Sequence, residues 1–231
     1  MTDTGAAAET AGAPDPTTRT HPDHPVIDKV VAVASNAGEA VHEYPDADSP
    51  LGGRFSDAVR AFDDAVDATL EPFRDQPAIR RIMNLATDAG EFSAVWHVSS
   101  ITRGLLKGRP DQIVAMAAGI GLESLIVNQG LKRLFKRRRP TDDGDARFEI
   151  RTPLTSSFPS GHASAAAFAA TVLVRWDGRR SAALWVPLAA TVAVSRPFVR
   201  IHHGSDIVGG VIAGVTMGAV AHRVFRRLGV G

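Results

Sequence analysis

The residues that can do chemistry fall into three short clusters, each at one end of an apolar segment. Residues 132–140 read KRLFKRRRP, residues 157–163 read SFPSGHA, and residues 195–206 read SRPFVRIHHGSD. Together they supply cations, hydroxyl groups, two histidines and a carboxylate. Such a set can hold an anion and place a nucleophile and a proton donor beside it.

The third cluster contains a histidine with a potential partner. His202 and Asp206 are four residues apart, a spacing that lets the carboxylate accept a hydrogen bond from one imidazole nitrogen. That bond would leave the other nitrogen as a base, nucleophile or metal ligand. A purely structural His–Asp pair is one alternative. A metal site is another, but Lys132, Arg139 and Arg196 would surround it, and cations repel metal ions and attract phosphate.

The second cluster precedes an alanine-rich segment with the composition of a helix. Ser160 and Gly161 stand at its start, where free N–H groups and the helix dipole favour a bound anion. A plain helix cap would explain the same residues. His162 lies where its imidazole could meet that anion. Because the first cluster adds cations, the three together indicate phosphoryl transfer, in which catalysis is mostly positioning and charge stabilisation.

Apolar segments that can position these clusters span residues 82–106, 113–131, 163–174, 182–194 and 207–225. None shows the alternation of a strand, so the predicted fold is all-α. Several are short for a bilayer crossing, which needs about 20 residues, and a soluble helical core is the alternative. Glycines spaced four apart (210, 214 and 218) and basic turns between the segments favour a membrane-embedded helical bundle of about four or five crossings.

The N-terminal third differs in charge from the rest of the chain. Residues 1–77 hold 15 acidic and 5 basic residues. Within them, residues 1–54 are predicted to form a disordered acidic tail. Residues 55–77 contain an amphipathic helix that either lies on a membrane or covers the rest of the protein. Residues 78–231 are then expected to form one membrane-embedded domain that carries all three clusters. The chain has no cysteine, which excludes disulfides and thiolate metal sites.

The three clusters have a spacing found in a known family. Lys132-x6-Arg139-Pro140, Pro159-Ser160-Gly161-His162 and Ser195-Arg196-x5-His202-x3-Asp206 together resemble the tripartite signature of the type 2 phosphatidic acid phosphatase family. The pair His203-Gly204 departs from it, since many members have an aromatic residue followed by proline. The departure leaves the signature positions intact and concerns the shape of the local loop.

The resemblance implies a role for each signature residue. His202 would attack phosphorus, with Asp206 orienting it, and His162 would protonate the leaving group and then activate water. The phosphoryl oxygens would be held by five groups: Lys132, Arg139, Arg196, the Ser160 hydroxyl and the Gly161 amide. No metal or other cofactor is implied. The remaining cations of the first cluster are expected to face the membrane: Arg133, Lys136, Arg137 and Arg138.

The predicted activity is hydrolysis of a phosphomonoester or diphosphate on a lipid. The chain is similar to bacterial polyprenyl-phosphate phosphatases, so a polyprenyl diphosphate or a phosphoribose-linked polyprenyl lipid of cell-wall synthesis is the preferred substrate. The alternatives are a phosphatidate or phosphatidylglycerophosphate phosphatase, a vanadate haloperoxidase, and a non-enzymatic membrane protein that binds anionic lipid. The expected partners are the lipid and the membrane, with no nucleic acid. The tail lacks a secretory signal, so the site is expected to face the cytoplasm of a bacterial cell.

Overall fold

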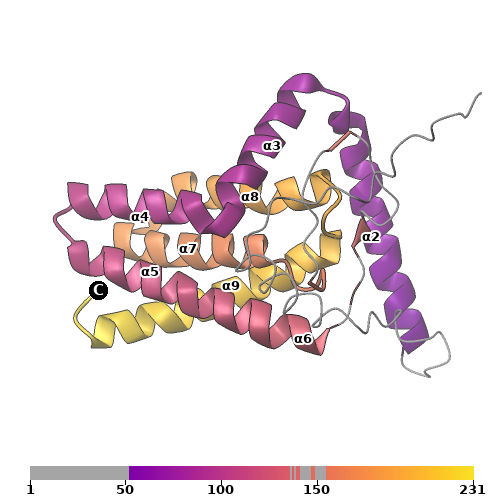
Figure 1. The fold of residues 1–231 in the computed structure, drawn as a ribbon. Coiled ribbons are helices and arrows are strands. Elements are labelled where there is room, and N and C mark those ends of the chain that lie inside the picture. Colours follow the sequence, from indigo (N-terminus) through magenta and orange to yellow (C-terminus); the bar gives the residue numbers. More distant parts are fainter. Residues whose placement is uncertain (1–51, 136, 138, 141–146, 149–154) are drawn as a thin grey trace, which may run out of the picture. The chain divides into compact units, whose positions relative to one another are not determined.

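The computed structural model describes residues 52–135, 137, 139–140, 147–148 and 155–231, and every regular element among them is a helix (Figure 1). This agrees with the all-α prediction. Residues 1–51 lie outside the described part, so the disorder of the acidic tail stays a prediction. The helices are α2 (Gly52–Arg74), α3 (Pro77–Gly90), α4 (Ala94–Leu106), α5 (Pro110–Leu125), α6 (Lys132–Leu134), α7 (Gly161–Asp177), α8 (Ala182–Phe198) and α9 (Gly204–Arg227).

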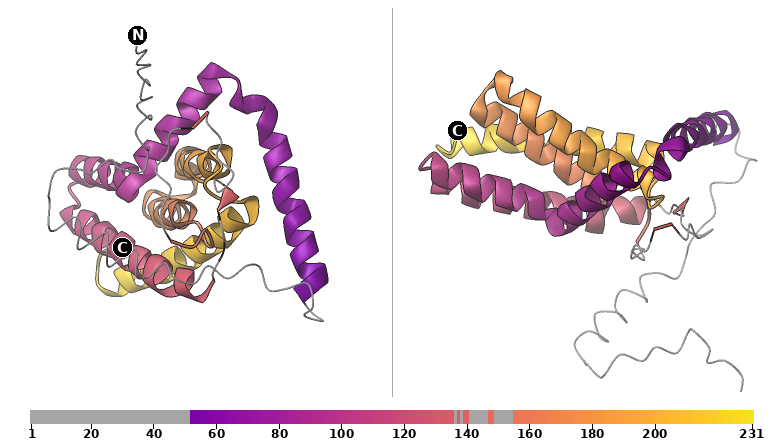
Figure 2. Two further views of the ribbon diagram at one scale, coloured as in Figure 1. Left: turned by 45° about the vertical axis from the view of Figure 1, so that its right-hand side comes forward. Right: turned by 90° about the horizontal axis from the view of Figure 1, so that it is seen from above.

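Helix α7 lies in the middle of the bundle, with α5, α8 and α9 packed against it (Figure 2). Its side chains form much of the core together with Trp96, Met116 and Trp185. The three glycines of α9 account for the closest contact. A Cβ on Gly210 would lie 2.5 Å from the Ser160 carbonyl oxygen, and one on Gly214 would lie 2.1 Å from that of Ser164. The predicted role of the glycine spacing in close helix packing is confirmed.

Helix α5 continues as a π-helical turn, Ile126–Leu131, into α6. By length and composition, the continuous helix from Pro110 to Leu134 and the helix α9 can each cross a membrane. Both correspond to predicted apolar segments, 113–131 and 207–225. The predicted total of four or five crossings remains a prediction.

The segment 82–106 is not one helix. It breaks at a short turn, Glu91–Ser93, where Phe92 and Ser93 both have positive φ (50° and 58°). This conformation is rare outside glycine, and neither residue type signals it in the sequence. The break makes α3 and α4 separate helices, with α3 packed on α8 and α4 on α5.

Helix α2 covers residues 55–74 of the predicted amphipathic segment 55–77 and packs against α8 and α9. Its last residue, Arg74, is fully buried and donates hydrogen bonds to the carbonyl oxygens of Phe198 (2.8 Å) and Pro197 (3.0 Å). These carbonyls lie at the end of α8, where helical partners run out, and that of Pro197 also accepts a hydrogen bond from the backbone N–H of Arg200 (3.1 Å). Asp67 pairs with Arg200 in the turn that follows (2.9 Å). The sequence left open whether this helix lies on a membrane or covers the rest of the protein, and the structure shows that it contacts the rest of the protein.

Candidate active site

The turn between α8 and α9 brings His202 and Asp206 together. The imidazole Nδ1 lies 3.4 Å from a carboxylate oxygen of Asp206, and both side chains are buried. On the other side of the ring, Nη1 of Arg139 lies 3.2 Å from Nε2. A guanidinium can only donate hydrogen bonds, so Nε2 is the acceptor. The proton of the neutral ring is then on Nδ1, facing Asp206, and the lone pair is on Nε2.

Burial determines the charge of His202, which lies outside the helices that can cross a membrane. It lowers the pKa of His202 to about 3, and the positive charges of Arg139 and Arg196 act in the same direction, while the hydrogen bond and the charge of Asp206 oppose them. The ring is therefore neutral at neutral pH. A neutral imidazole whose unprotonated Nε2 is released by Arg139 when that guanidinium binds an anion is a competent nucleophile.

Asp206 is held by more partners than the sequence indicated. The Ser157 hydroxyl donates to Oδ2 (2.9 Å), as does the backbone N–H of His203 (2.8 Å), and Arg137 donates to Oδ1. The expectation that Arg137 faces the membrane is wrong. Its side chain is only 10% exposed and bridges the Asp206 carboxylate to that of Asp63 in α2. Arg133 is exposed as expected, and Lys136 and Arg138 lie outside the described residues.

The second cluster forms the start of α7. Ser160 is its N-cap, accepting a hydrogen bond from the Ala163 N–H (3.4 Å), and its own N–H donates to the Asp206 carbonyl (3.0 Å). The second and third clusters are therefore joined by a backbone hydrogen bond. A Cβ on Gly161 would lie 3.2 Å from Asn128 Oδ1 and 3.9 Å from Lys132 Nζ. The absence of a side chain at Gly161 lets Lys132 approach the free amides of the helix.

The three signature cations surround this helix start. Lys132 lies close enough to Arg139, Arg196 and Asp206 to interact electrostatically with each of them. Arg139 is buried and fixed by the carbonyl oxygens of Thr155 (3.1 Å) and Ile201 (3.1 Å). Arg196 is 1% exposed, yet its Nε and Nη1 have no hydrogen-bond partner within the described part of the chain. Donors of this kind are costly to bury alone, and an anion would satisfy them.

His162 lies at the same place, near His202 and the charges of Arg196, Lys132 and Arg139. Its Nε2 has no hydrogen-bond partner among the described residues, and its nearest acid is Glu91, 3.6 Å away. Glu91 belongs to the break between α3 and α4, and the preceding Gly90 packs on the imidazole, since a Cβ there would lie 2.5 Å from its Cδ2. The sequence did not indicate that this break adjoins the site.

Helix α2 also reaches the site. The Asp63 carboxylate accepts hydrogen bonds from the backbone N–H (2.8 Å) and the hydroxyl (3.0 Å) of Ser205. A Cβ on Gly204 would lie 2.7 Å from Val66 Cγ2. The departure from the family pattern at Gly204 thus lies where α2 packs against the loop. Neither Asp63 nor Arg137 stands out in the sequence, because their partners lie far along the chain.

The assembled site has the candidate nucleophile His202, a second imidazole whose Nε2 has no hydrogen-bond partner among the described residues, and cations and amides arranged for an anion. All eight predicted site residues lie in this region. Within the residues that the structure describes, no group of three or more acidic or histidine side chains could hold a metal ion. The arrangement suits a tetrahedral oxyanion such as phosphate, held by Arg and Lys while Nε2 of His202 attacks.

Comparison with known proteins agrees with this geometry. Residues 112–229 match the PAP2 superfamily. The chain is 31% identical over 159 residues to the decaprenylphosphoryl-5-phosphoribose phosphatase of Mycolicibacterium smegmatis, covering 67% of this chain and 84% of that protein. It is 29% identical over 152 residues to the Mycobacterium tuberculosis enzyme of the same name, covering 65% and 82%.

A solved structure has the same fold. The transmembrane PAP2-type phosphatidylglycerolphosphate phosphatase of Bacillus subtilis superimposes with a TM-score of 0.60 at 19% identity, over 87% of this chain and 96% of that one. The family match includes all three clusters, and the resemblance predicted from their spacing is confirmed. The chain belongs to the PAP2 superfamily.

Proposed function

We propose that this protein hydrolyses a phosphomonoester or diphosphate on a polyprenyl lipid, through a phosphohistidine formed at His202. Its class is that of a lipid phosphatase of the PAP2 type. The observation that carries the chemistry is the pairing of a neutral His202, with its lone pair on Nε2, and a buried Arg196 whose Nε and Nη1 have no hydrogen-bond partner among the described residues. The first is a nucleophile and the second a place for the phosphoryl oxygens.

In the first step, Nε2 of His202 attacks phosphorus. A P–N bond forms and the P–O bond to the lipid breaks, while the leaving oxygen takes a proton from Nε2 of His162. Burial and the nearby cations lower the pKa of His162, and the negative charge of the bound phosphate opposes that shift, so that His162 carries the proton in the complex with substrate. The positive phosphoimidazole is stabilised through its Nδ1–H by Asp206. The charge on the phosphoryl oxygens is held by Lys132, Arg139, Arg196, the Ser160 hydroxyl and the Gly161 N–H, which are aimed there before the reaction.

In the second step, water replaces the imidazole. His162, now neutral, takes a proton from the attacking water, whose oxygen forms a new bond to phosphorus as the P–N bond breaks. Phosphate leaves, His202 is neutral again, and His162 carries the proton needed for the next turnover. Asp206 keeps its contacts with Ser157 and Arg137 throughout.

The lipid class rests on the relatives. Two are named as phosphatases of a decaprenylphosphoryl phosphoribose, which favours a polyprenyl lipid. The Bacillus subtilis neighbour is named for phosphatidylglycerolphosphate, which keeps a glycerolipid phosphate as the second candidate.

A phosphate-release panel on the purified protein in EDTA tests the proposal. It compares a polyprenyl phosphoribose phosphate, a polyprenyl diphosphate, phosphatidylglycerophosphate and p-nitrophenyl phosphate. We expect release from a polyprenyl substrate to be fastest, unaffected by EDTA and inhibited by vanadate. Activity lost on chelation and restored by magnesium or zinc would contradict the proposed chemistry, and faster release from phosphatidylglycerophosphate would contradict the lipid class.

Labelling with a phosphorylated substrate tests the two histidines. His202→Ala should abolish the covalent label. His162→Ala should slow turnover but retain some label with p-nitrophenyl phosphate, whose leaving group needs little protonation. His222→Ala is the matched control, because this histidine lies in α9, well along the helix from the site. Label that persists in His202→Ala would place the nucleophile elsewhere.

A further inference from the structure

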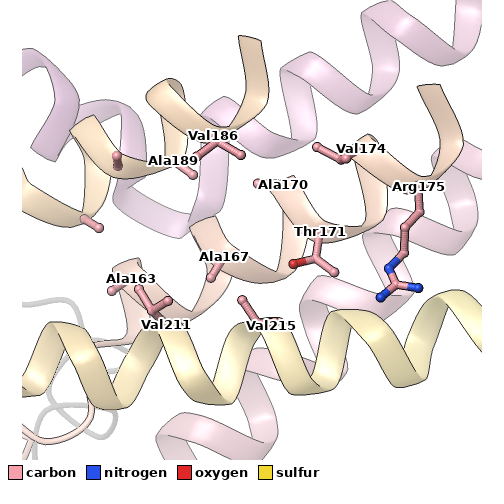
Figure 3. Close-up of a pocket in the computed structure, with 12 residues that line it drawn as sticks. Ala163, Ala167, Ala170, Thr171, Val174, Arg175, Val186, Ala189, Val211 and Val215 are labelled. Atoms are coloured by element: carbon pink, nitrogen blue, oxygen red, sulfur yellow. The ribbon is translucent and has the colours of Figure 1, made fainter. Parts of the chain in front are cut away.

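An apolar groove lies between α7, α8 and α9, with a volume of about 370 Å³ (Figure 3). Helices α8 and α9 each pack on α7 but make few contacts with one another, which leaves α7 as the floor and the other two as walls. All but two of its twelve lining residues are alanine or valine. The volume is within the range of roughly 300–1,000 Å³ that is usual for ligand sites.

The groove begins close to the candidate active site on all three helices. Its first residue on α7 is Ala163, directly after His162. Its first residue on α8 is Ala193, three positions before Arg196, and on α9 Val211, five positions after Asp206. Three to five residues make about one turn of helix. Each helix therefore carries a residue of the candidate site and, within about one and a half turns, a residue of the groove.

The length of the groove suits one lipid chain. Its floor runs along one face of α7 from Ala163 to Arg175, which lie at opposite ends in Figure 3. Twelve residues of helix span about 18 Å, while one leaflet of a bilayer has a hydrocarbon thickness of about 15 Å. The floor is free of charge until Arg175. A chain attached to phosphate at the site would thus remain in apolar surroundings for the depth of a leaflet.

We propose that this groove binds the single isoprenoid chain of the lipid substrate, directly below the phosphate. This inference rests on the proposed function and extends it to the rest of the substrate. The small side chains of Ala167, Ala170 and Ala190 leave the space open. Recognition of the chain is by apolar burial, while the cations at the helix ends hold the phosphate.

The test is to fill the groove without touching the site. Ala190 is an exposed residue of the α8 wall, so Ala190→Phe places a ring in the groove with little disturbance of the core. Ala118→Phe is the matched control, because Ala118 is an exposed alanine of α5 that does not line the groove. Hydrolysis of farnesyl phosphate and p-nitrophenyl phosphate is measured for both variants and the unsubstituted protein.

We expect Ala190→Phe to lower kcat/KM for farnesyl phosphate about tenfold or more, the scale for excluding a few methylene groups from an apolar site. Its kcat/KM for p-nitrophenyl phosphate should match that of Ala118→Phe, which also shows that the variant is folded. If both variants treat farnesyl phosphate alike while activity is intact, the groove inference is wrong and the proposed function stands. If the unsubstituted protein hydrolyses neither ester, the proposed function fails and the inference with it.

A second measurement uses linear alkyl phosphates of increasing length. In the unsubstituted protein, kcat/KM should rise with chain length until the chain reaches the far end of the groove, and then level off. In Ala190→Phe the rise should stop at shorter chains. A dependence on chain length that is the same in both proteins would overturn the inference.

Discussion

Substitution of Arg137 by alanine should impair both stability and catalysis, although this residue is outside the family signature. Its guanidinium joins the buried carboxylates of Asp206 and Asp63, and it also donates to the Ser205 hydroxyl (2.7 Å). The substitution leaves two buried carboxylates without their shared cation. Breaking such a buried pair costs about 3–5 kcal/mol. For a chain of this size that corresponds to a fall in thermal midpoint on the order of 10 °C.

The effect on rate follows from the position of Asp206. A charge-assisted hydrogen bond contributes about 1.5–3 kcal/mol. If Asp206 needs that bond to stabilise the positive phosphoimidazole, kcat falls about 10- to 100-fold. The Michaelis constant should change much less, because Arg137 donates to Asp206 and Asp63 rather than lying among the groups assigned to the phosphoryl oxygens.

The assay measures the thermal midpoint and phosphate release from p-nitrophenyl phosphate. Arg133→Ala is the control, since this exposed arginine lies in the same basic run and its loss should cost less than about 0.5 kcal/mol. Asp63→Asn keeps the shape but removes one of the two charges, and combined with Arg137→Ala it should cost less than the sum of the single changes. If Arg137→Ala matches Arg133→Ala in midpoint and kcat, the argument for a shared cation is refuted.

Three further predictions concern the loop, the packing of α2 and the orientation. Because the pKa of His202 is lowered to about 3, only the unfolded chain binds its proton as the pH falls below about 6.5. The contribution of His202 to the free energy of unfolding should then drop by about 1.4 kcal/mol per pH unit. Denaturant titrations at several pH values should therefore show that the free energy of unfolding depends less on pH in His202→Gln, and an equal dependence in both proteins would contradict the pKa argument. Gly204→Ala should destabilise the protein by about 1–3 kcal/mol through overpacking against Val66, measured as a lower midpoint, with recovery on adding Val66→Ala; no loss would mean that α2 is not packed there. For a site facing the cytoplasm, an impermeant thiol reagent on intact cells should label a cysteine introduced at Gly178 but not one at Arg133, and the reverse result would place the site outside.

The chemistry of the site was predictable because it is encoded locally. His202 and Asp206 are only four residues apart across the start of α9, and the Ser160 cap is equally local, and the structure places the members of each contact together. The contacts of Arg137 with Asp63 and Asp206 were not predictable in this way. Their partners are 74 and 69 residues away in the sequence, and a basic run gives no sign of which of its members points inward.

The fold was predictable in its helices but less so in their ends. Apolar periodicity indicates most of them, and the glycine spacing in α9 indicates where two helices touch. The break after Gly90 was missed because it depends on two ordinary residues, Phe92 and Ser93, in a conformation that costs energy. Tertiary contacts, such as Gly90 against His162, determine it. The number of crossings is equally nonlocal, since short alanine-rich helices insert only with partners.

The π-helical turn before Lys132 makes the direction of this lysine, the first cation of the family signature, sensitive to the deletion of a single residue. A π-turn is equivalent to one residue inserted into an α-helix, and Ile126–Leu131 forms such a turn. Deleting one residue there would restore a regular α-helix and rotate everything after it by about 100°. The apolar span would remain long enough, but Lys132 would point away from Gly161. Relatives that lack the extra residue would have to supply this cation from another position. Alignments of this segment should therefore match the residues of the π-turn first and the lysine second.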